Sequence, residues 1–166
     1  MLEITPLRAN DPLVFEAAFG DLGWVKPAIL FKRYLSEQDS GERPVFVARL
    51  DGEFAGYVTV VWQTTYAPFR EAGVPEIQDL NVLPAFRRRG IASALMDAAE
   101  ARIATRGKIA GLGVGLYPDY GPAQRMYVLR GYVPDGLGVT YDRVTARPGD
   151  TVRLDDELAL YFTREL

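Results

Sequence analysis

The stretch Asn81–Met96, "NVLPAFRRRGIASALM", decides how the fold is interpreted. The run of strand-like residues before it ends at Val82, and Pro84 prevents further strand pairing. A compact turn then leads into a predicted helix over about 89–105. Apolar residues recur there at every fourth position, at Ile91, Leu95, Ala99 and Ile103. A strand that enters an amphipathic helix in this way is typical of a domain that mixes helices and sheet.

The turn between this strand and this helix is suited to binding an anion. The first turn of a helix carries unpaired backbone N–H groups and the positive end of the helix dipole. Gly90 lets a ligand approach the backbone, and Ala92 and Ser93 are small. The arginines Arg87–Arg89 are unfavourable at a helix start, by about 0.3–1 kcal/mol each when exposed, unless an anion is present. A solvated basic helix start is the alternative, and local physics alone weighs the two equally.

The composition limits the chemistry. The chain has 166 residues, which suits a single domain over 1–166. It has no cysteine and no histidine, which excludes disulfides, thiol nucleophiles, histidine acid–base catalysis and thiolate or imidazole metal sites, so we expect no metal. The formal net charge of −3 argues against a general nucleic-acid-binding protein.

The start of the chain and its hydropathy bear on location. "MLEITPLRAND" (1–11) has neither the basic region nor the apolar region of a signal peptide. No apolar run approaches the length of about 18 residues that indicates a membrane span. We therefore expect a cytoplasmic protein without a membrane partner.

Periodicity and turn signals predict the other elements. A hairpin over 43–63 turns at Asp51-Gly52, and a loop follows over 64–75. Helices are predicted from Asn10 or Asp11 as N-cap with Pro12 in the first turn, and over 26–41 and 121–131. Further strands are predicted over 3–8, 76–82, 109–117, from Tyr132, and over 157–166. This order indicates an α/β or α+β domain with a mixed sheet.

Two motifs identify a family resemblance. The first run resembles the acetyl-CoA-binding core of the GNAT superfamily of N-acetyltransferases, whose signature Gln/Arg-x-x-Gly-x-Gly/Ala is matched by Arg87, Gly90 and Ala92. The segment "LYPDYGPAQRMYVLRGYVPDG" (116–136) is also similar to this family, with a tyrosine on a short helix and Gly-Tyr opening a strand. The element order matches over the whole chain. The resemblance implies one GNAT-like domain with a mostly antiparallel sheet of about six to seven strands, about four helices and two splayed central strands.

The resemblance implies acetyl-CoA as co-substrate and assigns residues to it. In the family, turn amides hold the pyrophosphate, which corresponds to Arg88, Arg89, Gly90, Ile91, Ala92 and Ser93, with Arg87 opening the signature. The strand before the turn pairs with the pantetheine arm and thioester, which corresponds to Leu80, Asn81 and Val82. The cofactor lies between this strand and the strand near Gly113. The glycines Gly111, Gly113 and Gly115 suit close approach, although a weak strand against a crowded helix explains them equally.

Acetyl transfer to an amine raises two proton problems. An amine with a pKa near about 10 must lose a proton before it attacks, and the leaving thiolate benefits from a donor. The resemblance implies Tyr127 as the acid, although a core tyrosine is the alternative. It implies Glu76 as a base, directly or through water, although a solvated strand-end glutamate is the alternative. Strand alternation puts the neighbouring Asp79 on the other face from Glu76 unless a bulge intervenes. Tyr120 stands where the family often has an asparagine that contacts pantetheine.

The resulting hypothesis is an N-acetyltransferase that transfers acetyl directly to a small-molecule or peptide amine in a ternary complex. A catalytically silent CoA-binding sensor or scaffold is the second hypothesis, and a nucleic-acid-binding domain using the arginines is disfavoured by the acidic charge. The resemblance leaves a homodimer open. It also places acceptor specificity near the aromatic residues Trp24, Phe31, Tyr34, Tyr66 and Phe69 and the acidic run Asp155–Glu157. For any one of these residues, an ordinary core or solvated role is favoured.

Overall fold

The computed structural model describes residues 1–166 and contains eight strands in one sheet and five α-helices. The strands are β1 (Leu2–Pro6), β2 (Val45–Leu50), β3 (Glu53–Val61), β4 (Glu76–Val82), β5 (Ile109–Gly115), β6 (Val133–Tyr141), β7 (Val144–Thr145) and β8 (Leu158–Glu165). The helices are α1 (Asp11–Gly20), α2 (Ala28–Asp39), α3 (Ala67–Ala72), α4 (Ile91–Ala104) and α5 (Gly121–Leu129), with 3₁₀ turns η1 (Pro84–Phe86) and η2 (Pro118–Tyr120). The predicted fold class is confirmed, with slightly more strands than predicted.

The strand order in the sheet is β1-β2-β3-β4-β5-β8-β6-β7. The pairs β1–β2, β2–β3, β5–β8, β6–β8 and β6–β7 are antiparallel, whereas β4 and β5 are parallel. The β4–β5 ladder consists only of Glu76↔Gly111 and Ile77↔Leu112, although each strand has seven residues. The two central strands therefore pair over a small part of their length, in agreement with the predicted splay.

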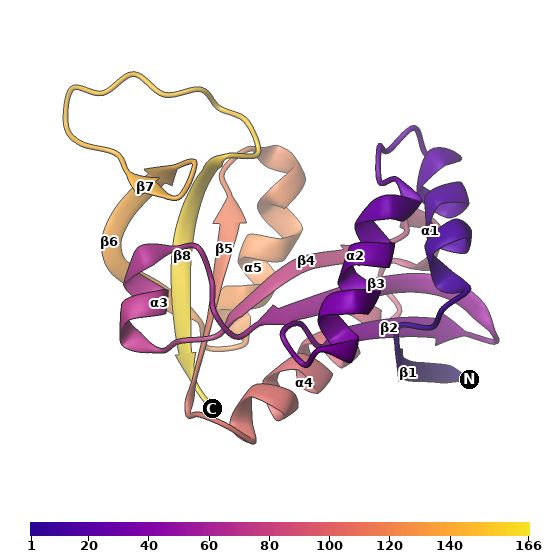
Figure 1. Ribbon diagram of the computed structural model, residues 1–166. Helices are drawn as coiled ribbons and strands as arrows, with labels where there is room; N and C mark the ends of the chain where they lie inside the picture. Colours follow the sequence, from indigo (N-terminus) through magenta and orange to yellow (C-terminus); the bar gives the residue numbers. More distant parts are fainter. The chain divides into compact units, whose positions relative to one another are not determined.

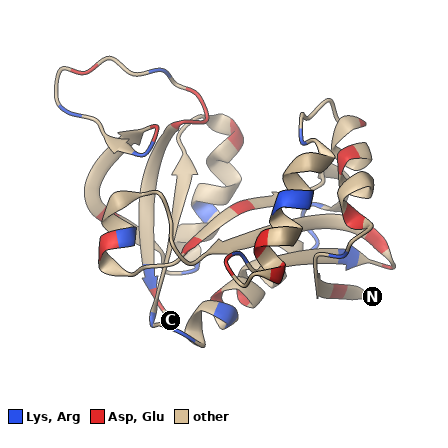
Figure 2. Ribbon diagram, viewed as in Figure 1, with Lys and Arg blue, Asp and Glu red and all other residues tan.

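The chain forms two compact units, and β4 contributes residues to both. The first unit comprises Met1–Val61 and Gln78–Arg102, and the second comprises Trp62–Ile77 and Ile103–Leu166. Lys or Arg and Asp or Glu residues are interspersed within each unit, as Figure 2 shows. No helix combines the length and the apolarity that crossing a membrane requires.

The first unit has an aromatic core beneath its antiparallel strands. Figure 1 shows α1 and α2 side by side in this unit. Phe15 of α1 stacks on Phe54 of β3 with ring centroids 3.8 Å apart, and Phe31 of α2 meets Tyr57 edge-on at 5.4 Å. Such pairs add to the stabilisation from burial alone. This core holds β2 and β3, and β3 is the neighbour of β4 in the sheet.

Two local predictions in the first unit have different outcomes. Asp51 and Gly52 have φ angles of 52° and 88°, which confirms the predicted hairpin turn. Asn10 occupies the cap position of α1 but makes no side-chain cap bond. Asp11 lies inside the helix, where its carboxylate accepts from the Arg8 N–H at 2.7 Å and pairs with Arg49 at 2.6 and 2.7 Å. A buried ion pair therefore holds the start of α1.

The second unit contains β8 between β5 and β6, as Figure 1 shows. The glycines of β5 make room there for aromatic rings of the chain itself. A Cβ atom at Gly111 would lie 2.3 Å from the Phe69 ring, and one at Gly115 would lie 2.4 Å from the Tyr120 ring. At Gly113 it would lie 2.9 Å from Tyr161. These three glycines therefore have a packing role that neither predicted interpretation included.

The predicted loop over 64–75 is wrong in its middle, which forms α3. Pro68 stands in the first turn of this helix, where its missing N–H costs nothing. Gly73 ends the helix with a φ of 66°. Phe69 is buried and meets Tyr66 edge-on at 4.9 Å. Pro68 and Gly73 are typical loop residues, but they are also the start and stop signals of a short helix.

Candidate functional site

The turn between β4 and α4 leaves helix N–H groups open. The α-helix begins at Ile91, two residues later than predicted, and the first bond of its ladder runs from the Ala94 N–H to the Gly90 carbonyl at 3.0 Å. The N–H groups of Ile91, Ala92 and Ser93 therefore have no acceptor within the helix. Together with the helix dipole, they give this end of α4 a partial positive charge.

Gly90 explains both the late start of the helix and the open approach to it. Its φ angle of 77° lies in the left-handed region, which excludes it from the helix and favours glycine. A Cβ atom at Gly90 would meet no heavy atom within 4 Å, so the space before the turn is free. Arg88 also has a positive φ of 62°. Backbones folded in this way present N–H groups to one side and bind anions.

The three arginines are exposed but differ in what they contact. Arg87 donates from Nε to the Val82 carbonyl at 3.2 Å, and its guanidinium lies 5.9 Å from the Trp24 ring centroid. Arg89 lies 5.8 Å from the Phe86 ring. Arg87 thus fastens the turn to the end of β4. The exposed cations around the open N–H groups make the turn fit a diphosphate.

β4 is irregular where it approaches this turn, because Asp79 has a φ of 57°. Its carboxylate accepts from Lys26 at 2.8 Å, from Tyr34 at 3.0 Å, from Tyr57, and from the Asn81 side chain at 2.8 Å. We call these five residues the Asp79 network. Asn81 also donates to the Asp79 carbonyl at 3.1 Å. The β4 backbone is therefore irregular at Asp79, and several hydrogen bonds hold this residue in place.

The Asp79 network has a defined electrostatic balance. Burial raises the pKa of Asp79, but the charge of Lys26 and hydrogen bonds from Lys26, Tyr57 and Tyr34 lower it more, so the pKa lies below its ordinary value. Burial and the Asp79 charge raise the pKa values of Tyr34 and Tyr57. The carboxylate is therefore ionised and the two phenols are protonated at neutral pH.

A glycine of β3 admits the β4 backbone next to this network. A Cβ atom at Gly56 would lie 2.3 Å from the Asn81 carbonyl oxygen and 3.0 Å from the Val82 Cα. The Leu83 N–H donates to the Ala55 carbonyl at 2.9 Å. Gly56 is a position that our sequence reasoning missed, although a glycine within a β-rich run is a signal of close backbone approach.

Glu76 is buried at the start of β4, with 2% of its surface exposed. Its carboxylate accepts from Arg143 at 2.9 and 3.3 Å and from the Thr64 hydroxyl. Arg143 lies at the turn between β6 and β7, where it and Asp142 have φ angles of 64° and 47°. The alternative of a solvated strand-end glutamate is wrong. No local sequence signal links Glu76 to a partner 67 residues further along the chain.

Tyr127 is the one buried residue of α5, with 7% of its surface exposed. It meets Tyr132 at a ring-centroid distance of 5.9 Å and an interplanar angle of 65°. Burial raises the pKa of Tyr127, so its phenol is protonated at neutral pH. Packing therefore holds the Tyr127 side chain, and its role as the acid stays a prediction.

Tyr120 is hydrogen-bonded to a carboxylate of the chain itself. Its hydroxyl donates to Asp156 at 2.8 Å, and Tyr117 donates to the same carboxylate oxygen. The Gln124 amide donates to the Gly115 carbonyl at 2.8 Å, next to the Tyr120 ring. Hydrogen bonds from the two tyrosines lower the pKa of Asp156.

The residues expected near an acceptor are mostly engaged within their own unit. Phe31 and Tyr34 belong to the core of the first unit, and Tyr66 stacks on Tyr161 at 3.6 Å in the second. Asp155 accepts from the Tyr141 hydroxyl at 3.0 Å. Their positions support the ordinary structural roles that the sequence favoured.

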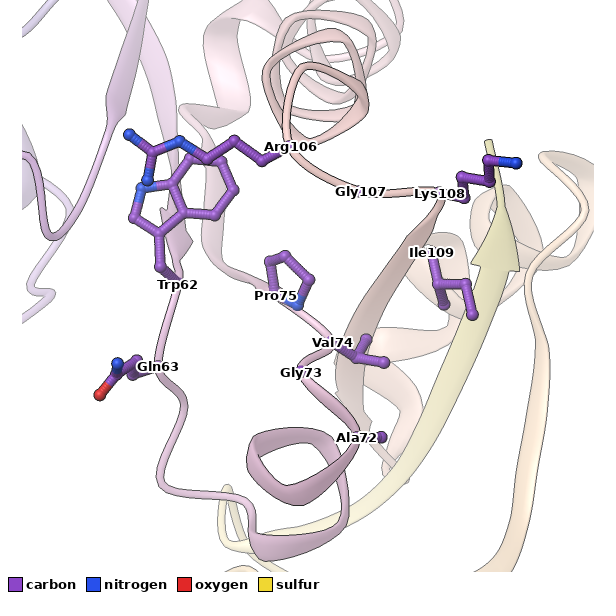
Figure 3. A pocket seen from close by; sticks show the side chains of 10 residues that line it. All are labelled: Trp62, Gln63, Ala72, Gly73, Val74, Pro75, Arg106, Gly107, Lys108 and Ile109. Atoms are coloured by element: carbon purple, nitrogen blue, oxygen red, sulfur yellow. The ribbon is translucent and has the colours of Figure 1, made fainter.

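A separate cavity of about 400 Å³ lies in the second unit. Figure 3 shows the Arg106 guanidinium over the Trp62 indole, at 4.3 Å from the ring centroid, and Pro75 beside the opening. The cavity is lined by Trp62, Gln63, Ala72, Gly73, Val74, Pro75, Arg106, Gly107, Lys108 and Ile109. This lining contains no carboxylate and no tyrosine, and none of the predicted site residues.

No group of three or more His, Cys, Asp or Glu residues is placed to hold a metal ion.

Comparison with known proteins decides the family. The model of the acetyltransferase (GNAT) family matches residues 14–132. The chain belongs to the GNAT family. A relative in Archaeoglobus fulgidus, described as an uncharacterized N-acetyltransferase, is 40% identical over 88 residues. The match covers 51% of this GNAT chain and 56% of the relative, so it spans little more than half of either protein.

Solved structures share this fold over nearly the whole chain. An N-acetyltransferase from Staphylococcus aureus Mu50 has a TM-score of 0.73 at 14% identity, covering 99% of this chain and 98% of its own. Arabidopsis thaliana NAA60 in complex with acetyl-CoA has a TM-score of 0.70 at 16% identity, covering 100% and 99%. A Salmonella typhimurium acetyl transferase that modifies the N-terminal serine of ribosomal protein L7/L12 has a TM-score of 0.73 at 11% identity, covering 99% and 95%. At these identities, the likeness supports the fold.

Proposed function

We propose that this protein transfers the acetyl group of acetyl-CoA to a primary amine by direct transfer in a ternary complex. One observation carries the proposal: Gly90, at a φ of 77° and with open space before it, precedes the free N–H groups at the start of α4. Membership of the GNAT family supports it, as does the structural neighbour that holds acetyl-CoA. Acetyl-CoA supplies an activated acetyl thioester when it is bound.

The cofactor-binding part of the proposal concerns the first unit. The N–H groups of residues 88–93 bind the pyrophosphate, and the Arg88 and Arg89 side chains add positive charge. Arg87 holds the turn against the end of β4 through the Val82 carbonyl. The backbone of residues 80–82 (Leu80, Asn81 and Val82) runs along the pantetheine arm. Each of these roles uses a group that is exposed or carried by the backbone.

The proton-transfer part concerns the second unit. As the amide C–N bond forms and the thioester C–S bond breaks, Glu76 takes the amine proton, directly or through water, and Tyr127 gives a proton to the thiolate. Glu76 accepts three hydrogen bonds, which leaves about one of a carboxylate's four acceptor positions. Asp79 accepts four, so it is the poorer candidate for the base.

The acceptor that we propose is a small-molecule or peptide amine. The Salmonella typhimurium neighbour acts on a protein N-terminus, which makes a free peptide N-terminus the first acceptor to test. A single domain over 1–166, a cytoplasmic location and a homodimer stay predictions. The CoA-binding sensor stays the second candidate, because the turn by itself accounts for binding and not for turnover.

The test measures thiol release from acetyl-CoA with a panel of small amines and of peptides with free or blocked N-termini. We expect turnover with at least one free amine and none with the blocked peptides. Gly90→Glu should weaken CoA binding by at least about 100-fold, because its carboxylate would stand beside the pyrophosphate. Ser40→Glu, far along the sequence at the end of α2, is the control for added charge. CoA binding without turnover on any amine would favour the sensor, and unchanged affinity in Gly90→Glu would overturn the site.

A further inference from the structure

The β4 backbone adopts an unusual conformation at Asp79, directly before residues 80–82, which are proposed to contact acetyl-CoA. Asp79 has a φ of 57°, a region that residues with a side chain rarely occupy, although aspartate and asparagine tolerate it best. Residues in this region persist where their surroundings hold them. The question is what holds Asp79 in this conformation, since a regular strand would be easier to form.

The Asp79 carboxylate supplies the answer, because its acceptor positions are filled. Oδ1 accepts from Lys26 and Asn81, and Oδ2 accepts from Tyr34 and Tyr57. A carboxylate has about four acceptor positions, so no further donor is accommodated without loss of one of these. Lys26 also donates to the Tyr57 hydroxyl at 3.0 Å, which links two of the donors to each other.

The donors come from separate elements of the first unit. Lys26 lies between α1 and α2, Tyr34 on α2, and Tyr57 on β3. Tyr57 is fully buried, and the side chains of Lys26 and Asp79 are 20% and 21% exposed. The network therefore fastens one point of β4 to three elements that the aromatic core already holds.

The network also reaches the next residues of β4. The Asn81 side chain turns back to bind both the carboxylate and the carbonyl of Asp79. The Asn81 carbonyl also lies against Gly56 of β3, where a Cβ atom would be only 2.3 Å away. Side-chain hydrogen bonds and close packing against β3 therefore both hold residues 79–81 in place.

We propose that Asp79 is a positioning residue, whose carboxylate holds β4 in the positive-φ conformation that presents the backbone of residues 80–82 to acetyl-CoA. This inference rests on the proposed function. It assigns Asp79 no proton transfer, because its acceptor positions are filled. It predicts that losing the carboxylate weakens CoA binding more than it slows the transfer from bound acetyl-CoA.

Three substitutions separate the backbone conformation from the carboxylate. Asp79→Ala loses the network and disfavours the positive φ, Asp79→Gly loses the network but accepts the φ, and Asp79→Asn keeps both in part. We expect the CoA dissociation constant from calorimetry to rise at least 10-fold, about 5-fold and less than 3-fold, respectively. Tyr57→Phe, which removes one donor, should raise it about 2-fold. The KM for acetyl-CoA should follow the same order, with kcat within about 3-fold.

The matched control is Asp11→Asn, which weakens another buried carboxylate–cation pair of the same unit. It should lower the melting temperature without changing CoA affinity beyond 2-fold. If Asp79→Gly binds CoA as wild type does, or if Asp11→Asn loses as much affinity as Asp79→Asn, the positioning role is wrong. If wild type itself binds no CoA, the proposed function fails instead, and the two failures are thereby distinguished.

Discussion

β4 carries two carboxylates that are each bonded to a cation, Glu76 at its start and Asp79 at its middle, and they differ in the number of acceptor positions that stay free. Glu76, in the second unit, binds Arg143 and Thr64 and retains about one acceptor position. Asp79, in the first unit, binds four donors and retains none. The same functional group therefore differs in free acceptor capacity at two positions of one strand, and we propose Glu76 as the base and Asp79 as a residue that positions the backbone.

The difference teaches that residue type and strand position are insufficient to assign a general base. Both residues are acidic, both lie on the strand before the cofactor turn, and both have a positively charged partner. What separates them is the number and origin of their donors. Variants that change the surroundings of one carboxylate and leave the other intact therefore test the assignment of the base.

The largest expected effect is the fall in kcat when Glu76 is replaced. Glu76→Gln keeps the size of the side chain but removes its basicity, so kcat should fall about 10²–10³-fold. The KM for acetyl-CoA should stay within 2-fold, because the residues proposed to bind the cofactor belong to the first unit. Glu37→Gln, which alters an ion pair on α2, is the control and should leave kcat unchanged. A full rate in Glu76→Gln would remove Glu76 from the mechanism.

Gly56→Ala tests the backbone position of β4 next to Asp79 without changing the Asp79 carboxylate. The added methyl group would collide with the Asn81 carbonyl, so β4 must shift. We expect a loss of about 1–3 kcal/mol of unfolding free energy, as for overpacked cores, and a several-fold rise in the CoA dissociation constant. Gly20→Ala, whose Cβ meets nothing within 4 Å, is the control. Equal effects of the two alanines in urea unfolding and CoA titration would contradict the close approach.

Tyr127→Phe extends the comparison to the proposed acid of the second unit. A thiol has an ordinary pKa of about 8.5, so its thiolate leaves readily and the loss of the donor should lower kcat only about 10-fold. Because burial raises the pKa of Tyr127, its ionisation should not limit the wild-type rate below pH 10. A pH–rate profile of both proteins tests this, and equal rates across the profile would exclude the role.

The smallest expected effect is a pH dependence of the unfolding free energy that comes from the Asp79 carboxylate. The pKa of Asp79 is lower in the folded protein than its ordinary value of about 3.9, so its charge stabilises the fold above that pH. This contribution is lost as the pH falls through the folded-state pKa. The difference in unfolding free energy between wild type and Asp79→Asn, measured in urea, should therefore shrink from pH 6 to pH 3. A constant difference would contradict the proposed balance of charges.

Much of the fold was predictable because its signals are local. The stripe of Ile91, Leu95, Ala99 and Ile103 is buried as predicted, and the Asp51-Gly52 turn has the expected backbone. The fold class followed from the order of such elements. The helix α3 was missed because Pro68 and Gly73 serve equally well in a loop and at the ends of a short helix.

The surroundings of the site residues were not predictable from the same signals. Arg143 reaches Glu76, and Lys26 reaches Asp79, from 67 and 53 residues away, respectively, and neither cation stands in a motif. The positive φ of Asp79 depends on those distant donors, so strand alternation offered no sign of it. Pairing between distant segments is set by the tertiary fold, which local periodicity does not describe.

The most direct test titrates CoA into Glu76→Gln and Asp79→Gly in the same calorimetric experiment as wild type. We predict that Glu76→Gln binds CoA within 2-fold of wild type, whereas Asp79→Gly binds about 5-fold more weakly. Equal affinities of the two variants, or weaker binding by Glu76→Gln than by Asp79→Gly, would contradict the division of roles along β4.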